Sequence, residues 1–374
     1  MTAPPSWDRA ARLLVPDLPP YDVLCAAANR GDGLREADAR QIDLDLPRST
    51  VSCLDLDDEA LPTHLEQLRR LLRAWCVLRP ETGYSQAMNF VASVMLHACG
   101  HDEKRAFALF AALIVALPID FYAEWPPLHG FQVEVGALLQ LLEERVPTLL
   151  SDELREALPL FACRCFLNLW VGVLPLPCLM AVWSLHLGAA DDAEASSPRT
   201  SRLGRGRRSS AASASGEGAN LSVALALLML SEDEVTQASQ MCDAGLAFAA
   251  LLRACEKAAT DPAALLALAR GGAAVPAATA RRLRSASRAE LAGDHVHAAE
   301  AGLAAGGPFG GVGGLADLTH ITLEELEALR RQLEALEAES RTRASVASVA
   351  SVGGASAASV ASPASPASPA SPAS

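Results

Sequence analysis

Apolar residues recur at three- and four-residue intervals along most of the chain, and the strict alternation typical of strands is scarce. One apolar stripe covers residues 65–75 and another covers residues 128–142. Both stripes have the period of a helix that turns one face toward a core. The pattern therefore predicts an all-α fold.

Residues suited to helix starts stand before several of these stripes. Ser151 precedes Asp-Glu, and Asp261 precedes Pro262, so each supplies an N-cap with a favourable first turn. Thr63 and Glu66 have the spacing of a capping box, in which each side chain binds a free backbone N–H group. We expect helices to begin at these three points.

The segment 165–187, CFLNLWVGVLPLPCLMAVWSLHL, contains no charged side chain. It is long enough to cross a bilayer, which takes about 20 apolar residues. However, Pro175 and Pro177 lie in its middle, where they would break a helix. We therefore expect two buried helices joined by a proline turn, with no transmembrane span.

Two regions have compositions that do not support a packed core. Residues 189–219 are rich in Ser, Gly and Arg, and we expect them to form a disordered loop between helices. Within it, Ser209 and Ser210 follow an Arg cluster of the kind that basophilic kinases accept for phosphorylation, although a solvated Arg/Ser linker is the favoured interpretation. Residues 344–374 are a low-complexity Ser/Ala/Pro tail that we also expect to be disordered.

Residues 318–343 carry a short heptad-like pattern, with leucines at positions 326, 329, 333 and 336. This spacing predicts a coiled-coil helix, but it lasts only about two heptads, and sustained pairing needs three or four. Two alternatives stay open. Residues 323–337 form a homodimer or bind a partner helix, or the helix packs on its own domain.

Charge and cysteine content narrow the class of protein. The formal net charge is −13, which argues against nucleic-acid binding, because that binding depends on positive surface. The nine cysteines form no CxxC pair, and the N-terminal residues lack the apolar core of a signal peptide. We expect a cytoplasmic protein with free thiols.

The signatures of common enzymes and metal sites are missing. The sequence has no GxxxxGK[ST], GxSxG or HExxH motif. His97, Cys99 and His101 stand close together in HACGH, but their spacing does not match a tetrahedral zinc set. We therefore expect no bound metal or cofactor.

Two short polar segments are more informative. In RQIDLDLPRSTV, Ile42, Asp45 and Arg48 follow each other at three-residue intervals. Taken alone, this is an apolar anchor, a capping or pairing acid and an exposed arginine.

The second segment, RPETGYSQAMNF, places Tyr84, Gln86 and Asn89 at the start of an apolar helix. Taken alone, Tyr84 would be a core residue and Asn89 a helix cap. Three hydrogen-bonding side chains so close together at the mouth of a buried helix nevertheless suggest a functional turn.

In this order, the two segments resemble the TBC-domain family, the GTPase-activating proteins of Rab-type small GTPases. The family pattern is IxxDxxRT, an amphipathic helix, GYxQGMN, and later helices with a Trp-containing motif. Here the matching segments are residues 42–49, 65–75, 83–89 and the stretch that ends near Trp183. The resemblance covers roughly residues 20–255.

The resemblance implies a division of the chain. We expect an N-terminal extension (1–19), a TBC domain (20–258) with the loop 189–219, a helical segment with a Gly-rich linker (259–317), the coiled-coil helix (318–343) and the tail (344–374).

The resemblance also implies a function, acceleration of GTP hydrolysis in a Rab GTPase and so regulation of vesicle trafficking. Arg48 would be the arginine finger and Gln86 would position the attacking water. The supporting residues would be Ile42, which anchors the segment, Asp45, which holds Arg48, Tyr84, which packs beside Gln86, and Asn89, which fixes the turn.

No independent reaction is expected, since GTP and Mg²⁺ would belong to the partner. The alternative is a scaffold of the same fold that binds a small GTPase or trafficking adaptor without accelerating hydrolysis. Recruitment to endomembranes would be peripheral, because the chain ends without a lipidation motif.

Three positions depart from the family pattern. Ala87 replaces the Gly after the glutamine, Ser49 replaces the Thr after the arginine, and Ser184 replaces the acid after the late Trp. The Arg/Trp segment usual upstream of the domain is not evident in RLLVPDLPPYDVL. We expect Ala87 to weaken activity, because its methyl would stand where the partner's backbone approaches.

Overall fold

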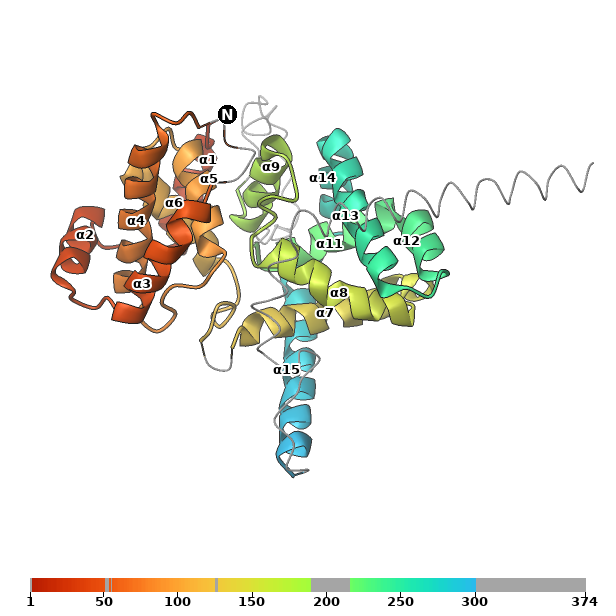
Figure 1. The fold of residues 1–374 in the computed structure, drawn as a ribbon. Helices are drawn as coiled ribbons and strands as arrows, with labels where there is room; N and C mark the ends of the chain where they lie inside the picture. Colours follow the sequence, from red (N-terminus) through yellow and green to blue (C-terminus); the bar gives the residue numbers. More distant parts are fainter. Residues whose placement is uncertain (1, 51–53, 55, 125–126, 190–215, 301–374) are drawn as a thin grey trace, which may run out of the picture. The chain divides into compact units, whose positions relative to one another are not determined.

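The computed structural model describes residues 2–50, 54, 56–124, 127–189 and 216–300 (Figure 1). Helices dominate, and no strand occurs in these ranges, so the predicted all-α fold is confirmed. The helices and 3₁₀ turns are α1 (Pro5–Leu14), α2 (Tyr21–Arg30), α3 (Glu36–Asp45), η1 (Leu46–Arg48), α4 (Leu61–Leu78), α5 (Met88–Ala98), α6 (Glu103–Val115), α7 (His129–Arg145), η2 (Pro147–Leu149), α8 (Asp152–Phe166), α9 (Leu176–His186), η3 (Gly216–Gly218), α11 (Ala219–Leu230), α12 (Glu232–Ser239), α13 (Ala244–Thr260), α14 (Pro262–Arg270) and α15 (Ala277–Glu300).

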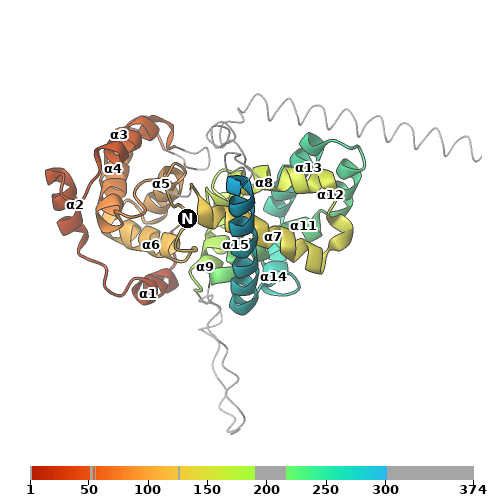
Figure 2. The same ribbon diagram turned by 90° about the horizontal axis from the view of Figure 1, so that it is seen from below.

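Helix α4 is the support of the N-terminal helices. It packs against α2, α3, α5 and α6, which surround it in Figure 2. Its buried face carries Leu68, Leu72 and Trp75, and the indole of Trp75 meets the ring of Phe110 edge-on at a centroid distance of 5.5 Å. Because α3 and α5 both rest on α4, the segments that bear the two sequence motifs are held by one rigid element.

The N-terminal residues are also part of the packed body. Helix α1 lies on α6 and buries Trp7 completely. The indole Nε1 of Trp7 donates a hydrogen bond to the hydroxyl of Ser184 (2.9 Å), and its ring lies 6.2 Å from that of Trp183. Ser184 thus forms a hydrogen bond at the position where the family pattern has an acid.

The predicted helix starts are confirmed at two of three points. Ser151 accepts a hydrogen bond from the Leu154 N–H group, and Asp261 accepts one from Ala264. The capping box at Thr63 is wrong, because α4 already begins at Leu61 and no side chain caps it. Pro62 in the first turn lacks the N–H group that a cap would otherwise have to satisfy.

Only the second of the two helices predicted for the apolar segment 165–187 is present as expected. Helix α8 ends at Phe166, and residues 167–174 form turns with positive φ at Leu169, Trp170 and Gly172. Helix α9 begins after Pro175, whose extended backbone (φ −65°, ψ 154°) serves as its N-cap. In the described part of the chain, no helix combines the length and the apolar character that crossing a membrane requires.

The predicted loop 189–219 needs a correction at its end, because residues 216–219 form η3 and the start of α11. A side chain at Gly216 would overlap the backbone of His186, and one at Gly218 would overlap that of Val275. These glycines permit close contact between backbone segments. The composition of the segment had instead suggested a flexible loop. Residues 190–215 lie outside the described residues, as do the predicted coiled-coil helix, the tail and residues 301–317.

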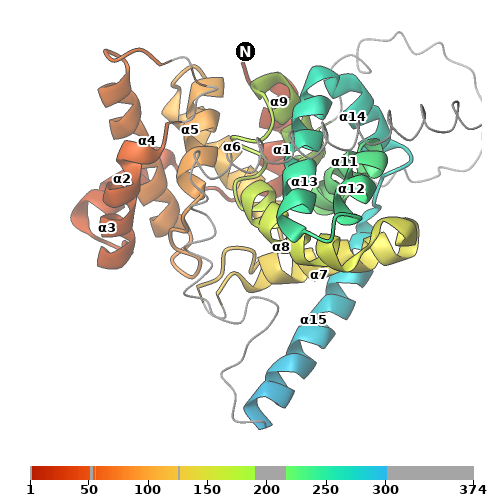
Figure 3. The same ribbon diagram turned by 45° about the vertical axis from the view of Figure 1, so that its right-hand side comes forward.

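Helix α15 packs against α7 and crosses it at a steep angle, as Figures 1 and 3 show. Arg284 of α15 donates two hydrogen bonds to the carboxylate of Glu134 on α7 (2.6 and 2.9 Å), and Glu134 is fully buried. The guanidinium of Arg288 binds Asp120 in the same way (2.5 and 2.7 Å). The expected domain end at residue 258 therefore does not coincide with an edge of the helical packing.

A buried polar contact joins α4 to α5. The ring Nε2 of His64 lies 2.8 Å from the hydroxyl of Ser93, and both side chains are fully buried. Burial, with a smaller contribution from the neighbouring rings of His101 and His97, lowers the pKa of His64 to about 4. The ring is therefore neutral in the folded protein at neutral pH.

We predict that replacing Arg284 by Met destabilises the protein by about 3 kcal/mol, because Glu134 would keep its buried charge without a partner. Arg282→Met is the matched control. Its bidentate pair with Glu144 is about half exposed (54% and 44%), so its loss should cost much less than that of Arg284. Urea unfolding of both variants checks the prediction, and equal losses would contradict it.

His64 predicts a loss of stability in acid. Its folded-state pKa is below the ordinary value of 6.5, so below pH 6.5 the unfolded chain takes up a proton that the folded chain refuses. The contribution of His64 to the unfolding free energy is therefore complete above pH 6.5. It declines as the pH falls toward 4, by up to about 1.4 kcal/mol per pH unit. His64→Leu should flatten the dependence of the unfolding free energy on pH in this window. An unchanged slope would contradict the assignment.

Candidate functional site

The first motif lies where α3 ends. Ile42 is fully buried and fixes the last turn of α3 to the core. Pro47, two residues after Asp45, has no N–H group to continue the helix, and the chain tightens into η1. Arg48 is the last residue of η1, and its side chain is 42% exposed. The turn thus exposes the charged side chain of Arg48, while Ile42, which anchors the preceding helix, is buried.

The carboxylate of Asp45 is completely buried and binds three side chains. Arg48 Nη2 and Gln41 Nε2 donate to its Oδ1 (2.5 and 3.0 Å), and the hydroxyl of Tyr84 donates to its Oδ2 (2.7 Å). Burial, reinforced by the charge of Asp45, raises the pKa of Tyr84 well above its ordinary value, so the phenol keeps the proton that it donates. Asp45 therefore connects the two motifs.

The second motif leaves α4 through a tight turn at Gly83. The backbone there has φ 63°, and a side chain would overlap the guanidinium of Arg35 and the carboxylate of Asp38, which bind each other (2.8 and 2.9 Å). The indole Nε1 of Trp75 donates to the carbonyl of Gly83 (3.0 Å). The segment that follows is thus fixed to α4 just before Tyr84.

Gln86 and Ala87 are the central residues of a β-turn. The Met88 N–H group donates to the carbonyl of Ser85 (3.1 Å), and Ala87 has φ 96° and ψ −30°. This conformation at the third residue is that of a type II turn, which favours glycine. Gln86 is partly exposed and Ala87 is buried. The backbone conformation of this turn therefore explains by itself why the family pattern has glycine at this position, whether or not a partner approaches it closely.

Asn89 and Ser49 form a second connection between the motifs. The Asn89 side chain accepts from the N–H group of Ala87 (3.1 Å) and donates to the hydroxyl of Ser49 (2.9 Å). Ser49 in turn donates to the carbonyl of Asp45 (2.8 Å). Asn89 and Ser49 are both fully buried.

The structure brings the predicted site residues to one place. The contact expected between Asp45 and Arg48 is present, and so is the one by which Asn89 holds the turn. Their roles in catalysis stay predictions.

Sequence analysis did not assign roles to Gln41, Gly83 or Ser49. Gln41 stands four residues before Asp45, a helical spacing that gives a signal for their contact. The hydrogen bond between Ser49 and Asn89 joins segments that are distant in the chain, so no pattern in the sequence indicates it.

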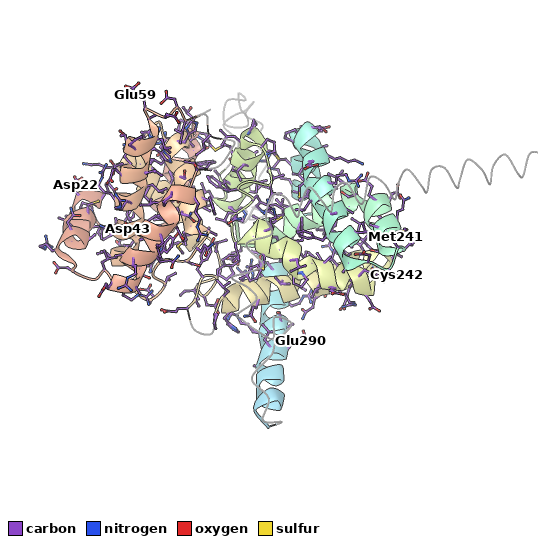
Figure 4. The ribbon with its side chains drawn as sticks, viewed as in Figure 1. Asp22, Asp43, Glu59, Met241, Cys242 and Glu290 are labelled. Carbon is purple, nitrogen blue, oxygen red and sulfur yellow. The ribbon has the colours of Figure 1, made fainter. Side chains whose placement is uncertain are left out.

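Ion pairs on the surface hold α3 on α4. Asp43, which Figure 4 labels on α3, accepts hydrogen bonds from Arg69 (2.9 Å) and from Arg73 (2.8 and 3.1 Å). Within the described ranges, no group of three or more His, Cys, Asp or Glu side chains is arranged to hold a metal ion. The guanidinium of Arg48 and the carboxamide of Gln86 are partly exposed polar groups of the site.

We predict that Ala87→Gly raises the unfolding free energy by about 1 kcal/mol, because glycine adopts φ 96° without strain. The matched control is Ala26→Gly on the exposed face of α2, which should lower it by about 1 kcal/mol. Denaturant unfolding measures both changes. A lower unfolding free energy in Ala87→Gly would show that the backbone of Ala87 is not strained.

This chain is similar to known TBC-domain proteins over part of its length. The profile of the Rab-GTPase-TBC domain matches residues 29–193. TBC1 domain family member 2A of Bos taurus is 29% identical over 188 residues, which are 49% of this chain and 20% of that protein. Growth hormone-regulated TBC protein 1 of Xenopus tropicalis is 27% identical over 141 residues, 37% of this chain and 40% of that protein.

The chain thus spans less than half the length of these relatives. A solved structure, that of the Chlamydomonas flagellar RabGAP TBC domain, matches with a TM-score of 0.50 and 21% identity. The match covers 70% of this chain and 77% of that one, and it supports the fold. Residues 29–193 of this chain are thus similar to the Rab-GTPase-TBC domain, and the helical fold is similar to that of a solved TBC domain.

Proposed function

We propose that this chain accelerates GTP hydrolysis by a Rab-type small GTPase, with Arg48 and Gln86 acting in the partner's nucleotide site. The observation that carries the proposal is the pair of turns at Arg48 and Gln86. Each presents a partly exposed polar side chain, and both are held by the buried carboxylate of Asp45 and the buried amide of Asn89. The match of residues 29–193 to the profile of the Rab-GTPase-TBC domain supports the same conclusion.

The proposed role of Arg48 follows from the charge of the reaction. Phosphoryl transfer spreads negative charge over the phosphoryl oxygens, and a guanidinium that stays protonated neutralises it. An arginine finger accelerates hydrolysis about 10³–10⁵-fold. Arg48 is tethered to Asp45 in the free protein, so its side chain is oriented before the partner arrives.

The proposed role of Gln86 is to hold the attacking water. A carboxamide both donates and accepts hydrogen bonds, so it can orient a water molecule in line with the phosphoryl group. Gln86 stands on a turn that is fixed by the Ser85–Met88 hydrogen bond and by Asn89. A rigid turn keeps the amide in position at low entropic cost.

GTP and Mg²⁺ belong to the partner in this proposal, and the chain supplies no independent reaction. Action on a Rab-type GTPase would place the protein in vesicle trafficking, with peripheral recruitment to endomembranes through its partner.

One observation favours a second function, that of a scaffold which binds a GTPase or trafficking adaptor without accelerating hydrolysis. Ala87 carries a methyl group in a conformation that favours glycine, immediately after Gln86. The resulting strain, or contact of the methyl with the partner, would displace Gln86. In that case the partner would bind but hydrolysis would stay slow.

We predict that the wild-type chain accelerates single-turnover GTP hydrolysis by at least one member of a panel of Rab-type GTPases. Arg48→Ala and Arg48→Lys should each lose about 10³-fold or more of the acceleration, because lysine lacks the planar fork of the guanidinium. Gln86→Ala should lose about 10²-fold or more.

Arg40→Ala is the matched control. Arg40 is exposed on α3, the helix that directly precedes η1 and Arg48, and it pairs only with Glu36 among the contacts described. Its activity should stay within about twofold of wild type. Binding without acceleration by the wild type would establish the scaffold instead. Full activity in Arg48→Ala would reject the proposed mechanism.

A further inference from the structure

The two finger segments, residues 45–49 and 84–89, form a closed ring. Tyr84 is joined to Asp45 at one end, and Asn89 is joined to Ser49 at the other. The backbone completes both sides, so that Arg48 lies on one side of the ring and Gln86 on the other. The ring is defined here by its two segments and these two hydrogen bonds.

The hydroxyl of Ser49 is the junction that closes the ring. It accepts from Asn89 Nδ2 (2.9 Å) and donates to the carbonyl of Asp45 (2.8 Å), so its one proton and one of its lone pairs are both used. Ser49 is fully buried, and water cannot replace a lost partner without rearrangement. Removing the hydroxyl would leave the amide of Asn89 with an unsatisfied donor.

The loss would reach Gln86 through Asn89. The other end of the Asn89 amide accepts from the N–H group of Ala87, which directly follows Gln86 in the strained turn. A strained conformation persists only while its surroundings hold it in place. Ser49, which lies 40 positions before Asn89 in the chain, is thus required to keep that turn.

We propose that Ser49 is a positioning residue that couples the arginine finger to the glutamine finger. This inference rests on the proposed function for its effect on catalysis, while the coupling itself is a property of the free protein. Ser49 is fully buried and acts through Asn89 and the backbone of Asp45.

The chain offers a matched control at Ser222. That hydroxyl is also buried, donates to the carbonyl four residues earlier (Gly218, 2.8 Å) and accepts from a distant donor, the N–H group of Val275 (2.9 Å). Ser222→Ala therefore loses the same kinds of hydrogen bond as Ser49→Ala, but in η3 and α11 rather than in the ring.

The experiment compares Ser49→Ala, Ser49→Cys, Ser49→Thr and Ser222→Ala in the full chain. In single-turnover hydrolysis by the Rab GTPase that responds best, Ser49→Ala should lower the maximal rate by about 10–100-fold. The concentration for half-maximal rate should change by about twofold or less, because the docking surface is intact. Ser49→Cys, which keeps the volume but bonds weakly, should resemble Ser49→Ala. Ser49→Thr restores the hydroxyl and should recover most of the rate.

Hydrogen exchange at the Ala87 amide provides a readout that needs no GTPase. It should become about tenfold faster in Ser49→Ala and Ser49→Cys, and stay unchanged in Ser222→Ala. If the wild type activates no GTPase, the proposed function fails while exchange still tests the coupling. If Ser49→Ala matches Ser222→Ala in both rate and exchange, the coupling is rejected and the proposed function stands. If Ser49→Ala does not fold, Ser49→Cys decides between these outcomes.

Discussion

The buried carboxylate of Asp45 is the contact on which the site depends. A charge without access to water is stable only when donors surround it, and here Gln41, Arg48 and Tyr84 supply them. Two of these donors come from the segment that ends α3, and the third comes from the turn that precedes α5. The need to satisfy one buried acid therefore brings together two segments that lie far apart in the chain.

The rest of the fold supports this contact. Helix α4 carries α3 and α5 on its surface, and Trp75 holds the carbonyl of Gly83 just before Tyr84. A second contact, from Ser49 to Asn89, closes the ring, so each finger is restrained on both sides. Preorganisation of this kind lowers the cost of assembling a catalytic site, because the side chains are oriented before the partner binds.

Local chemistry could be predicted from the sequence, while contacts between distant segments could not. Helical periodicity gave the all-α fold, and the prolines at 175 and 177 indicated the break before α9. The contact of Asp45 with Arg48, three residues apart, was implied by the resemblance to the TBC-domain family. By contrast, no pattern in the sequence connects Ser49 to Asn89.

Glycine and its substitutes were the hardest to interpret. The composition around residues 216–218 suggested a flexible loop, but those glycines allow close backbone packing. At position 87 the family pattern of glycine was attributed to a partner's approach, whereas the backbone of the chain itself adopts φ 96° there. Composition does not distinguish glycine used for flexibility from glycine used for close packing or for a left-handed turn.

The central claim is that the ring presents Arg48 and Gln86 to the transition state of GTP hydrolysis. The most direct measurement is the affinity of the chain for a GDP-loaded Rab-type GTPase with and without aluminium fluoride, which mimics the transferring phosphoryl group. We expect the chain to bind the GDP-loaded GTPase at least about 10²-fold more tightly with aluminium fluoride than without it, because an activator is complementary to the transition state. Equal affinity in both conditions would contradict it.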